Sequence, residues 1–309
     1  MSKFIVVKKN DLFLYLLISI LLLVLLYSSI SYSFQRYTTL STSSNAFKEN
    51  INKYDLDGDG NVDDIEFSTN SKGYLINIKT HTGNFLLESS DYVENFIDIC
   101  DSFNIKLQFS DLSRDGIPEI IISGMKDNCL TSYIFYWDGL QFSELLSTTS
   151  NITGVLNSNN SICPNFLYGI SSKGDSSTEG IYFVNDSIKN ISFSNPKIPT
   201  FNIVQSFIDI IELDYELDTT PDIFSNNIST EELALLWNLD KEQNNYSFQS
   251  GYFSDTNWNS QGEIENMHWI LSFQKYDSSK SKNSISEIVI FLNIILDEHG
   301  NYKIESIKN

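Results

Sequence analysis

The feature that most constrains this chain is a nine-residue acidic run, Asp55–Asp63, which reads Asp-Leu-Asp-Gly-Asp-Gly-Asn-Val-Asp. Oxygen-bearing side chains occupy every second position, and Gly60 stands where the backbone must turn sharply. Such a loop can wrap Ca²⁺, which takes about six to eight oxygen ligands. The alternative is an acidic turn without a metal, in which the clustered carboxylates repel one another. The predicted ligands are Asp55, Asp57, Asp59, Asp63, Asn61 through its main-chain carbonyl, and Glu66 at the twelfth loop position.

Composition narrows the class of protein and of partner. The chain has 309 residues, 41% of them hydrophobic and 13% aromatic, which is enough for a membrane segment and one or two folded domains. Low charge with abundant Ser and Asn is typical of AT-rich bacterial genomes. A net charge of −20 argues against nucleic acid and anionic lipid as partners. It favours cations, basic partners or simple solubility outside the cell.

The cysteines do not indicate a zinc site or a disulfide-built scaffold. Only Cys100, Cys129 and Cys163 occur, and none forms a Cys-x-x-Cys pair. A Cys100–Cys129 disulfide in an exported domain and buried free thiols both remain open.

The N-terminal segment predicts a membrane anchor. The stretch from Leu12 to Phe34 is apolar and uncharged, and a transmembrane helix needs roughly 20 such residues. Three lysines precede it, so the positive-inside rule places the N-terminus in the cytoplasm and the remaining chain outside. The alternative is a signal peptide whose cleavage releases a secreted protein. Calcium is plentiful outside cells, so the acidic loop is expected to be permanently occupied and structural.

After an anchor over residues 1–36 and a linker over 37–49, residues 50–195 predict a β domain. Short alternating or apolar runs are separated by Asp-Gly and Gly-Asn turn signals. The expected strands include Gly73–Lys79, Asn104–Phe109, Glu119–Ser123, Tyr133–Trp137, Gly180–Val184 and Ser187–Phe193.

This region also repeats itself. The run Asp111–Glu119 lines up with the first loop 56 positions later, Gly116 matches Gly60, and an apolar strand follows each copy. Such self-similarity predicts repeat units that stack side by side. The second loop is a poorer ligand set, with a serine for an aspartate and Arg114 inserted, and a metal-free turn is the alternative. Its candidate ligands are Asp111, Ser113, Asp115, Ile117 and Glu119.

With a β-strand after each loop, residues 50–195 resemble the FG-GAP and VCBS repeats of integrin-type β-propellers. The run Tyr133–Phe142, with Asp138-Gly139 as its hairpin, resembles the closing strands of such a repeat. The resemblance implies calcium at the first loop and, less surely, at the second. A closed propeller needs at least about four blades. This region holds about three repeats at most, so we expect an open, incomplete or covered sheet.

Residues 196–309 predict an α+β domain. Apolar positions from Ile203 to Tyr215 recur at helical spacing, and a capping-box pattern, Ser229–Glu232, precedes a second short helix. Three strands are expected at Met267–Phe273, Ile288–Leu296 and Tyr302–Ile307. Helices followed by an antiparallel meander resemble, weakly, cystatin-like or nuclear-transport-factor-like sheets, an analogy that predicts no function.

No catalytic signature occurs among the three histidines, His81, His268 and His299, or elsewhere in the sequence. We therefore expect a non-enzymatic, membrane-anchored, extracytoplasmic binding or scaffold protein. Its partner would be a cell-surface protein or a polysaccharide. One alternative is a cell-wall or polysaccharide hydrolase that uses carboxylates of the C-terminal domain. Another is an accessory subunit recruited through the anchor. The aromatic residues Tyr252, Phe253, Trp258 and Trp269 are expected to form core rather than a ligand groove.

Overall fold

The computed structural model describes residues 54–92, 95–157, 164–169, 178–185, 187–191, 196–213, 221–277 and 284–309. All of them belong to one compact unit. The predicted transmembrane helix, the predicted linker and Cys163 lie outside the described residues. Within the described ranges, no helix is both long and apolar enough to span a bilayer.

The first half of this unit consists of antiparallel meanders. The first meander is β1 (Asp64–Asn70), β2 (Gly73–Lys79) and β3 (Asn84–Leu86), paired in chain order. The second meander is β4 (Lys106–Ser110), β5 (Glu119–Lys126), β6 (Cys129–Trp137) and β7 (Phe142–Thr148), again in chain order. The third meander is β8 (Ile152–Leu156), β9 (Asn165–Gly169), β10 (Thr178–Val184) and β11 (Ser187–Asn190).

The strand pairing keeps the 56-residue offset that the sequence predicts. The β1–β2 hairpin closes with Asn70 opposite Gly73, and the β5–β6 hairpin closes with Lys126 opposite Cys129. Each acidic loop leads directly into the first strand of its hairpin. The acidic loop and the hairpin that follows it are therefore repeated, with β1–β2 in the first meander matching β5–β6 in the second.

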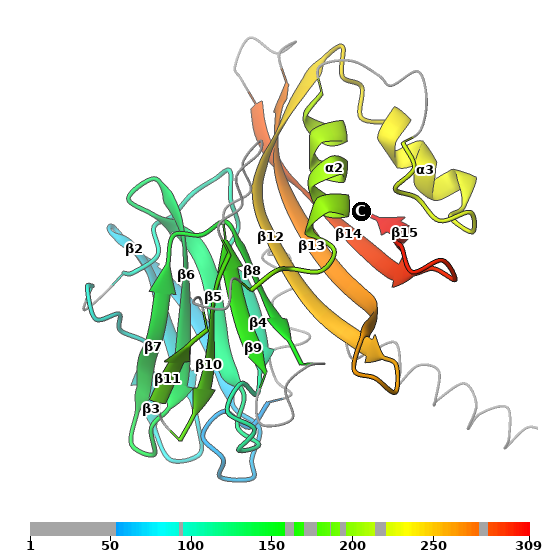
Figure 1. Ribbon diagram of the computed structural model, residues 1–309. Coiled ribbons are helices and arrows are strands. Elements are labelled where there is room, and N and C mark those ends of the chain that lie inside the picture. Colours follow the sequence, from blue (N-terminus) through cyan, green and yellow to red (C-terminus); the bar gives the residue numbers. More distant parts are fainter. Residues whose placement is uncertain are drawn as a thin grey trace, which may run out of the picture. The chain divides into compact units, whose positions relative to one another are not determined.

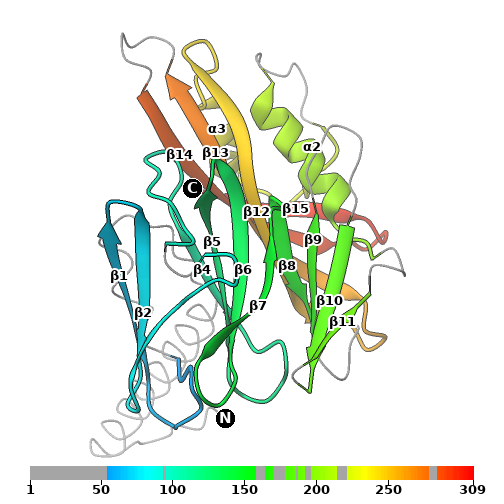
Figure 2. The ribbon, with the colours of Figure 1, turned by 90° about the vertical axis from the view of Figure 1, so that its left-hand side faces the viewer.

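The second meander is buried on both faces. Ile120 and Ile122 of β5 pack with the first meander, whereas Ile121 packs with β9 and β10 of the third. Successive side chains of a strand point to opposite faces. A strand between two layers is therefore continuously apolar, as the run Ile120–Ile122 is. Figure 2 shows these β-layers beside the C-terminal strands.

The C-terminal part places two helices on a curved sheet, as the sequence predicts (Figure 1). Helix α2 (Phe201–Glu212) contacts β12 (Asn244–Trp258) and β15 (Tyr302–Lys308), and α3 (Thr230–Trp237) contacts β15. The capping box of Ser229 and Glu232 is confirmed. The apolar side of α2 shares a core with Phe253 and Trp269.

Strand β12 was not predicted, and a β-bulge explains why. Its buried side chains lie at even positions up to Tyr246 and at odd positions from Gly251 onward, because the pairing with β13 (Ile264–Asp277) shifts between Phe248 and Ser250. An extra residue reverses the face that each later side chain occupies. Each part of β12 therefore alternates strictly over only a few residues, and neither part is long enough to predict a strand.

The third meander and the C-terminal strands form one eight-stranded sheet. Strand β8 pairs with β12 in parallel, and β12 continues antiparallel through β13, β14 (Ser284–Leu296) and β15. The sheet thus runs across the boundary predicted near residue 195. Within the described residues, the meanders do not close into a propeller.

The two halves are also joined by polar contacts. The Glu287 carboxylate of β14 pairs with Lys106 of β4 and accepts hydrogen bonds from Ser272 and from Asn104. Its side chain is only 5% exposed, so these donors compensate for the loss of water around a buried charge.

Candidate metal centre

The first acidic loop is folded around the Asp55 carboxylate. That carboxylate accepts hydrogen bonds from the backbone N–H groups of Gly58 (2.7 Å), Asp59 (3.1 Å) and Gly60 (2.8 Å). Both glycines have positive φ, 75° and 88°, a conformation that other residues adopt only at a cost. Leu56, 1% exposed, anchors the loop in the core between the first two meanders. The backbone therefore holds the acidic side chains together at one place.

Three of the predicted ligands meet in one group. Asp55, Asp57 and Asp63 each offer a carboxylate oxygen, and these oxygens all lie within 4.8 Å of one another. Thr82, between β2 and β3, donates its hydroxyl proton to Asp57 (3.0 Å). No sequence pattern indicated this contact, because it depends on how the hairpin folds back onto the loop.

Asp63 is the most informative member of the group. It is 1% exposed, and its Oδ2 accepts a hydrogen bond from the Leu56 N–H (2.6 Å). Its Oδ1 is buried and has no hydrogen-bond partner among the described residues. Burial raises the pKa of this carboxyl, the Leu56 hydrogen bond opposes that rise, and the charges of Asp57, Asp55 and Asp59 add to it.

A buried carboxylate oxygen without a donor is costly unless a cation accepts its lone pair. The atoms that could bind a metal here are all carboxylate oxygens, which suit a hard cation rather than a soft one. The group formed by Asp55, Asp57 and Asp63 can therefore hold a metal ion.

The two other predicted carboxylate ligands of this loop, Asp59 and Glu66, lie outside the group. Asp59 is exposed, and its Oδ1 accepts hydrogen bonds from the backbone and side chain of Asn61. Glu66 lies on β1, is about half exposed and pairs with Lys79 across the hairpin. The structure thus separates a compact acidic triad from the carboxylates of Asp59 and Glu66.

The second loop has the same backbone frame. Asp111 accepts from the Gly116 N–H (3.1 Å) as Asp55 does from Gly60, and Asp115 accepts from the Ile117 N–H (2.8 Å) as Asp59 does from Asn61. The Glu119 carboxylate accepts from the Leu112 N–H (2.5 Å), which repeats the bond between Asp63 and Leu56.

The carboxylates of the second loop do not form a corresponding metal-capable group within the described residues. Ser113 occupies the place of Asp57. Glu119, 2% exposed, accepts a hydrogen bond from its own backbone N–H in addition to that of Leu112. Burial raises the pKa of this carboxyl to about 7, the two backbone hydrogen bonds oppose the rise, and the charges of Asp115 and Asp111 add to it.

The other candidate residues have structural surroundings. Phe253 and Trp269 are fully buried, with ring centroids 4.8 Å apart, whereas Trp258 is 40% exposed and donates to Asp255. Half-buried His268 has a pKa lowered by burial and by the charge of Lys308.

Cys100 and Cys129 are both free, so the structure shows no disulfide between them. Cys129 is exposed and Cys100 is half-buried, which differs from the buried thiols considered above.

Comparisons with known proteins identify no family. No family model matches the chain, and no curated protein matches it. Among solved structures, the chain shares 11% identity with a mannose phosphorylase, MPT-4, from Leishmania mexicana. That match covers 75% of this chain and 58% of the other, with a TM-score of 0.28. An endo-1,4-beta-xylanase from Bacteroides thetaiotaomicron is 8% identical over 79% of this chain and 75% of the other, with a TM-score of 0.24. At these scores neither likeness indicates a shared fold.

Proposed function

We propose that this chain is a membrane-anchored, extracytoplasmic binding or scaffold protein whose first acidic loop holds Ca²⁺ as a structural ion. The observation that carries the proposal is the buried, unpartnered Oδ1 of Asp63 beside the carboxylates of Asp55 and Asp57.

Calcium fits this group better than the other common metals. Its ligands are hard oxygens, and calcium tolerates irregular geometry and additional main-chain or water oxygens. Zinc and copper prefer imidazole or thiolate. No histidine or cysteine belongs to the group. The further ligands of the FG-GAP-like loop, Asp59 and the Asn61 carbonyl, stand beside the group in sequence.

The ion would act on stability rather than on chemistry. Three carboxylates within 4.8 Å repel one another in the folded protein, and a divalent cation replaces that repulsion with attraction. Because the group is assembled only by folding, the free energy of binding adds to the free energy of folding. The loop leads into β1 and is anchored by Leu56, so the ion would fix the first meander against the second.

The cellular setting follows from the sequence. The uncharged run from Leu12 to Phe34 supports a single membrane anchor, and the preceding lysines support an extracytoplasmic position for the folded unit. Calcium at extracellular concentrations would keep a site of modest affinity occupied. The binding partner, a cell-surface protein or a polysaccharide, would contact the folded unit and not the ion.

Thermal unfolding of the full-length chain with calcium and with chelator tests this proposal. At a calcium concentration about 100 times Kd, the ion should stabilise the fold by about 3 kcal/mol, which raises Tm by about 5–10 °C for a unit of this size. Asp57→Asn should lose most of this increment, since it removes one charged ligand and keeps the shape of the side chain.

Asp64→Asn is the matched control, because Asp64 is the adjacent carboxylate and lies outside the metal-capable group. It should keep the full calcium-dependent shift. An unchanged midpoint of the unmodified chain on adding calcium would contradict the proposal. So would an equal loss of the shift in both variants.

A further inference from the structure

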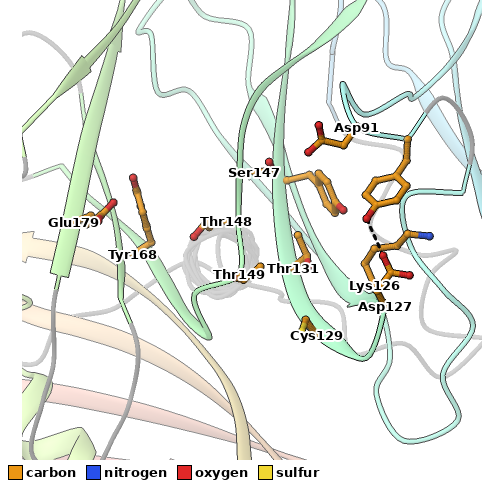
Figure 3. Close-up of a pocket in the computed structure, with 12 residues that line it drawn as sticks. Asp91, Lys126, Asp127, Cys129, Thr131, Ser147, Thr148, Thr149, Tyr168 and Glu179 are labelled. Carbon is orange, nitrogen blue, oxygen red and sulfur yellow. Dashed lines mark hydrogen bonds between the residues drawn. The ribbon is translucent and has the colours of Figure 1, made fainter.

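A cavity of about 550 Å³ lies away from the acidic loops, between the second meander and strands β9 and β10. Figure 3 shows Tyr168 and Glu179 on one side of it and Lys126 and Asp127 on the other, with Thr148 and Thr149 between them. Its volume suits a small organic molecule. Neither acidic loop contributes a residue to its lining.

The charges that line this cavity are mainly negative. Asp91, Asp127 and Glu179 are exposed carboxylates at its walls. Among the described residues, the one cationic side chain in this lining is Lys126, which already pairs with Asp98 (2.9 Å) and donates to the Asn95 carbonyl (2.9 Å). The cavity therefore presents an excess of negative charge.

Three tyrosines line the cavity, and the hydroxyls of two of them donate to its carboxylates. Tyr92 donates to Asp127 (2.7 Å), and Lys126 Nζ lies 4.5 Å from the centre of the Tyr92 ring. Burial, together with the hydrogen bond that Tyr168 donates to Glu179, raises the pKa of Tyr168 to about 12. Two carboxylates are thus each held at the cavity by a tyrosine hydroxyl.

Tyr133 differs from the other two. It is 2% exposed, it lines the cavity, and its hydroxyl has no hydrogen-bond partner within the described residues. Burial raises its pKa, and the negative charges of Glu144, Asp91 and Asp127 raise it further. The tyrosine hydroxyl therefore stays protonated, and the same negative field that holds its proton attracts a cation.

We propose that this cavity binds a small organic cation through a guanidinium group. Asp127 and Glu179 provide the counter-charge, and the Tyr133 hydroxyl and the Thr131 side chain provide hydrogen-bonding groups. The inference does not depend on the metal, because the cavity and the acidic triad share no residue.

Calorimetric titration of the full-length chain with arginine amide tests the proposal, with citrulline amide as the neutral-side-chain analogue. Arginine amide should bind saturably and at least about tenfold more tightly than citrulline amide, because the two differ only in the guanidinium charge and its donors. The variant Asp127→Asn/Glu179→Gln should weaken arginine amide binding by about tenfold or more.

A charge-matched control variant is Asp101→Asn/Glu298→Gln, since both residues are exposed and neither lines the cavity. It should bind arginine amide as the unmodified chain does. Tyr133→Phe, which removes only the hydroxyl, should weaken binding by a few fold and leave the circular dichroism spectrum unchanged. The proposal is overturned by the absence of saturable arginine amide binding, by equal affinity for citrulline amide, or by equal losses in the two double variants.

Discussion

The two acidic loops share the same backbone hydrogen bonds. They differ in whether a buried carboxylate oxygen is left without a hydrogen-bond partner. In both, an aspartate accepts the N–H of a glycine five residues on, and a buried carboxylate accepts the N–H seven residues back. In the first loop Asp63 keeps a buried oxygen without a partner, beside two further carboxylates. In the second loop Glu119 accepts two backbone hydrogen bonds, and Ser113 replaces one aspartate.

This difference separates loop shape from ion binding. The hydrogen bonds of Asp55 and Asp111 define the same turn in both loops. What distinguishes the loops is the number of carboxylate oxygens that no protein donor satisfies. The second loop therefore keeps the turn without a metal-capable group among the described residues, because Ser113 replaces one aspartate and Glu119 accepts two backbone hydrogen bonds.

The largest effect expected from the difference between the two loops is on the pH dependence of stability in the metal-free protein. The ordinary pKa of Glu119 is 4.5, and burial raises it to about 7 in the fold. The folded state then binds more protons than the unfolded state between these values, so stability is full below pH 4.5 and falls as pH rises toward 7. Between pH 5 and pH 8, the free energy of unfolding should fall by about 2–3 kcal/mol relative to Glu119→Gln.

Urea unfolding of both proteins in chelator at the two pH values measures this difference. The glutamine keeps an oxygen for the Leu112 N–H, so the comparison isolates the charge. If the free energy of unfolding changes equally with pH in the unmodified chain and in Glu119→Gln, the burial of a charged Glu119 does not limit the stability of the second loop.

An intermediate effect is expected from converting the second loop into the first. Ser113→Asp with Arg114→Gly makes its first six residues identical to Asp55–Gly60. The glycine also relieves the positive φ of Arg114, 60°, although it removes the hydrogen bond from Arg114 to Asn157. We expect the calcium-dependent increment in stability to grow by about 2 kcal/mol, because a second carboxylate set becomes available.

Differential scanning calorimetry with and without calcium measures that increment. Arg114→Gly alone is the control, since it changes the backbone without adding a ligand. The calcium-dependent increment in stability could be no larger in the double variant than in this control. That result would show that the hydrogen bonds of Glu119, and not Ser113, decide the difference between the loops.

The smallest effect concerns the contact between the two loops. A Cβ at Gly58 would lie 2.6 Å from Cδ1 of Ile117, whereas one at Gly60 would meet no atom within 4 Å. Both glycines have positive φ, so alanine costs about 1–2 kcal/mol at either position. Gly58→Ala should cost about 1 kcal/mol more than Gly60→Ala, and Ile117→Val should recover that excess.

Equilibrium urea unfolding of the single and double variants provides this cycle. Gly58→Ala and Gly60→Ala could lower the free energy of unfolding equally, or Ile117→Val could fail to restore it. Either result would mean that the loops fold independently of their contact.

Local sequence patterns made the acidic loops, the repeated hairpin and the two helices predictable. Alternating oxygen residues with Gly60 fixed the acidic turn, and its displaced copy predicted the second loop and the repeated hairpin. The capping box at Ser229 and the apolar spacing after Ile203 predicted the helices. These features depend on hydrogen bonds and side-chain periodicity over a few residues, which the sequence displays directly.

The tertiary structure decided what depends on distant segments. The bulge in β12 concealed a strand, and the parallel pairing of β8 with β12 joined two regions that the sequence separated. That pairing needs Gly154, because a Cβ there would lie 2.4 Å from the carbonyl oxygen of Phe253. The sequence supplied the acidic residues of the first loop. Only folding placed Asp63 beside Asp55 and Asp57 with one oxygen buried and unpaired, because burial and hydrogen-bond partners depend on the packed layers.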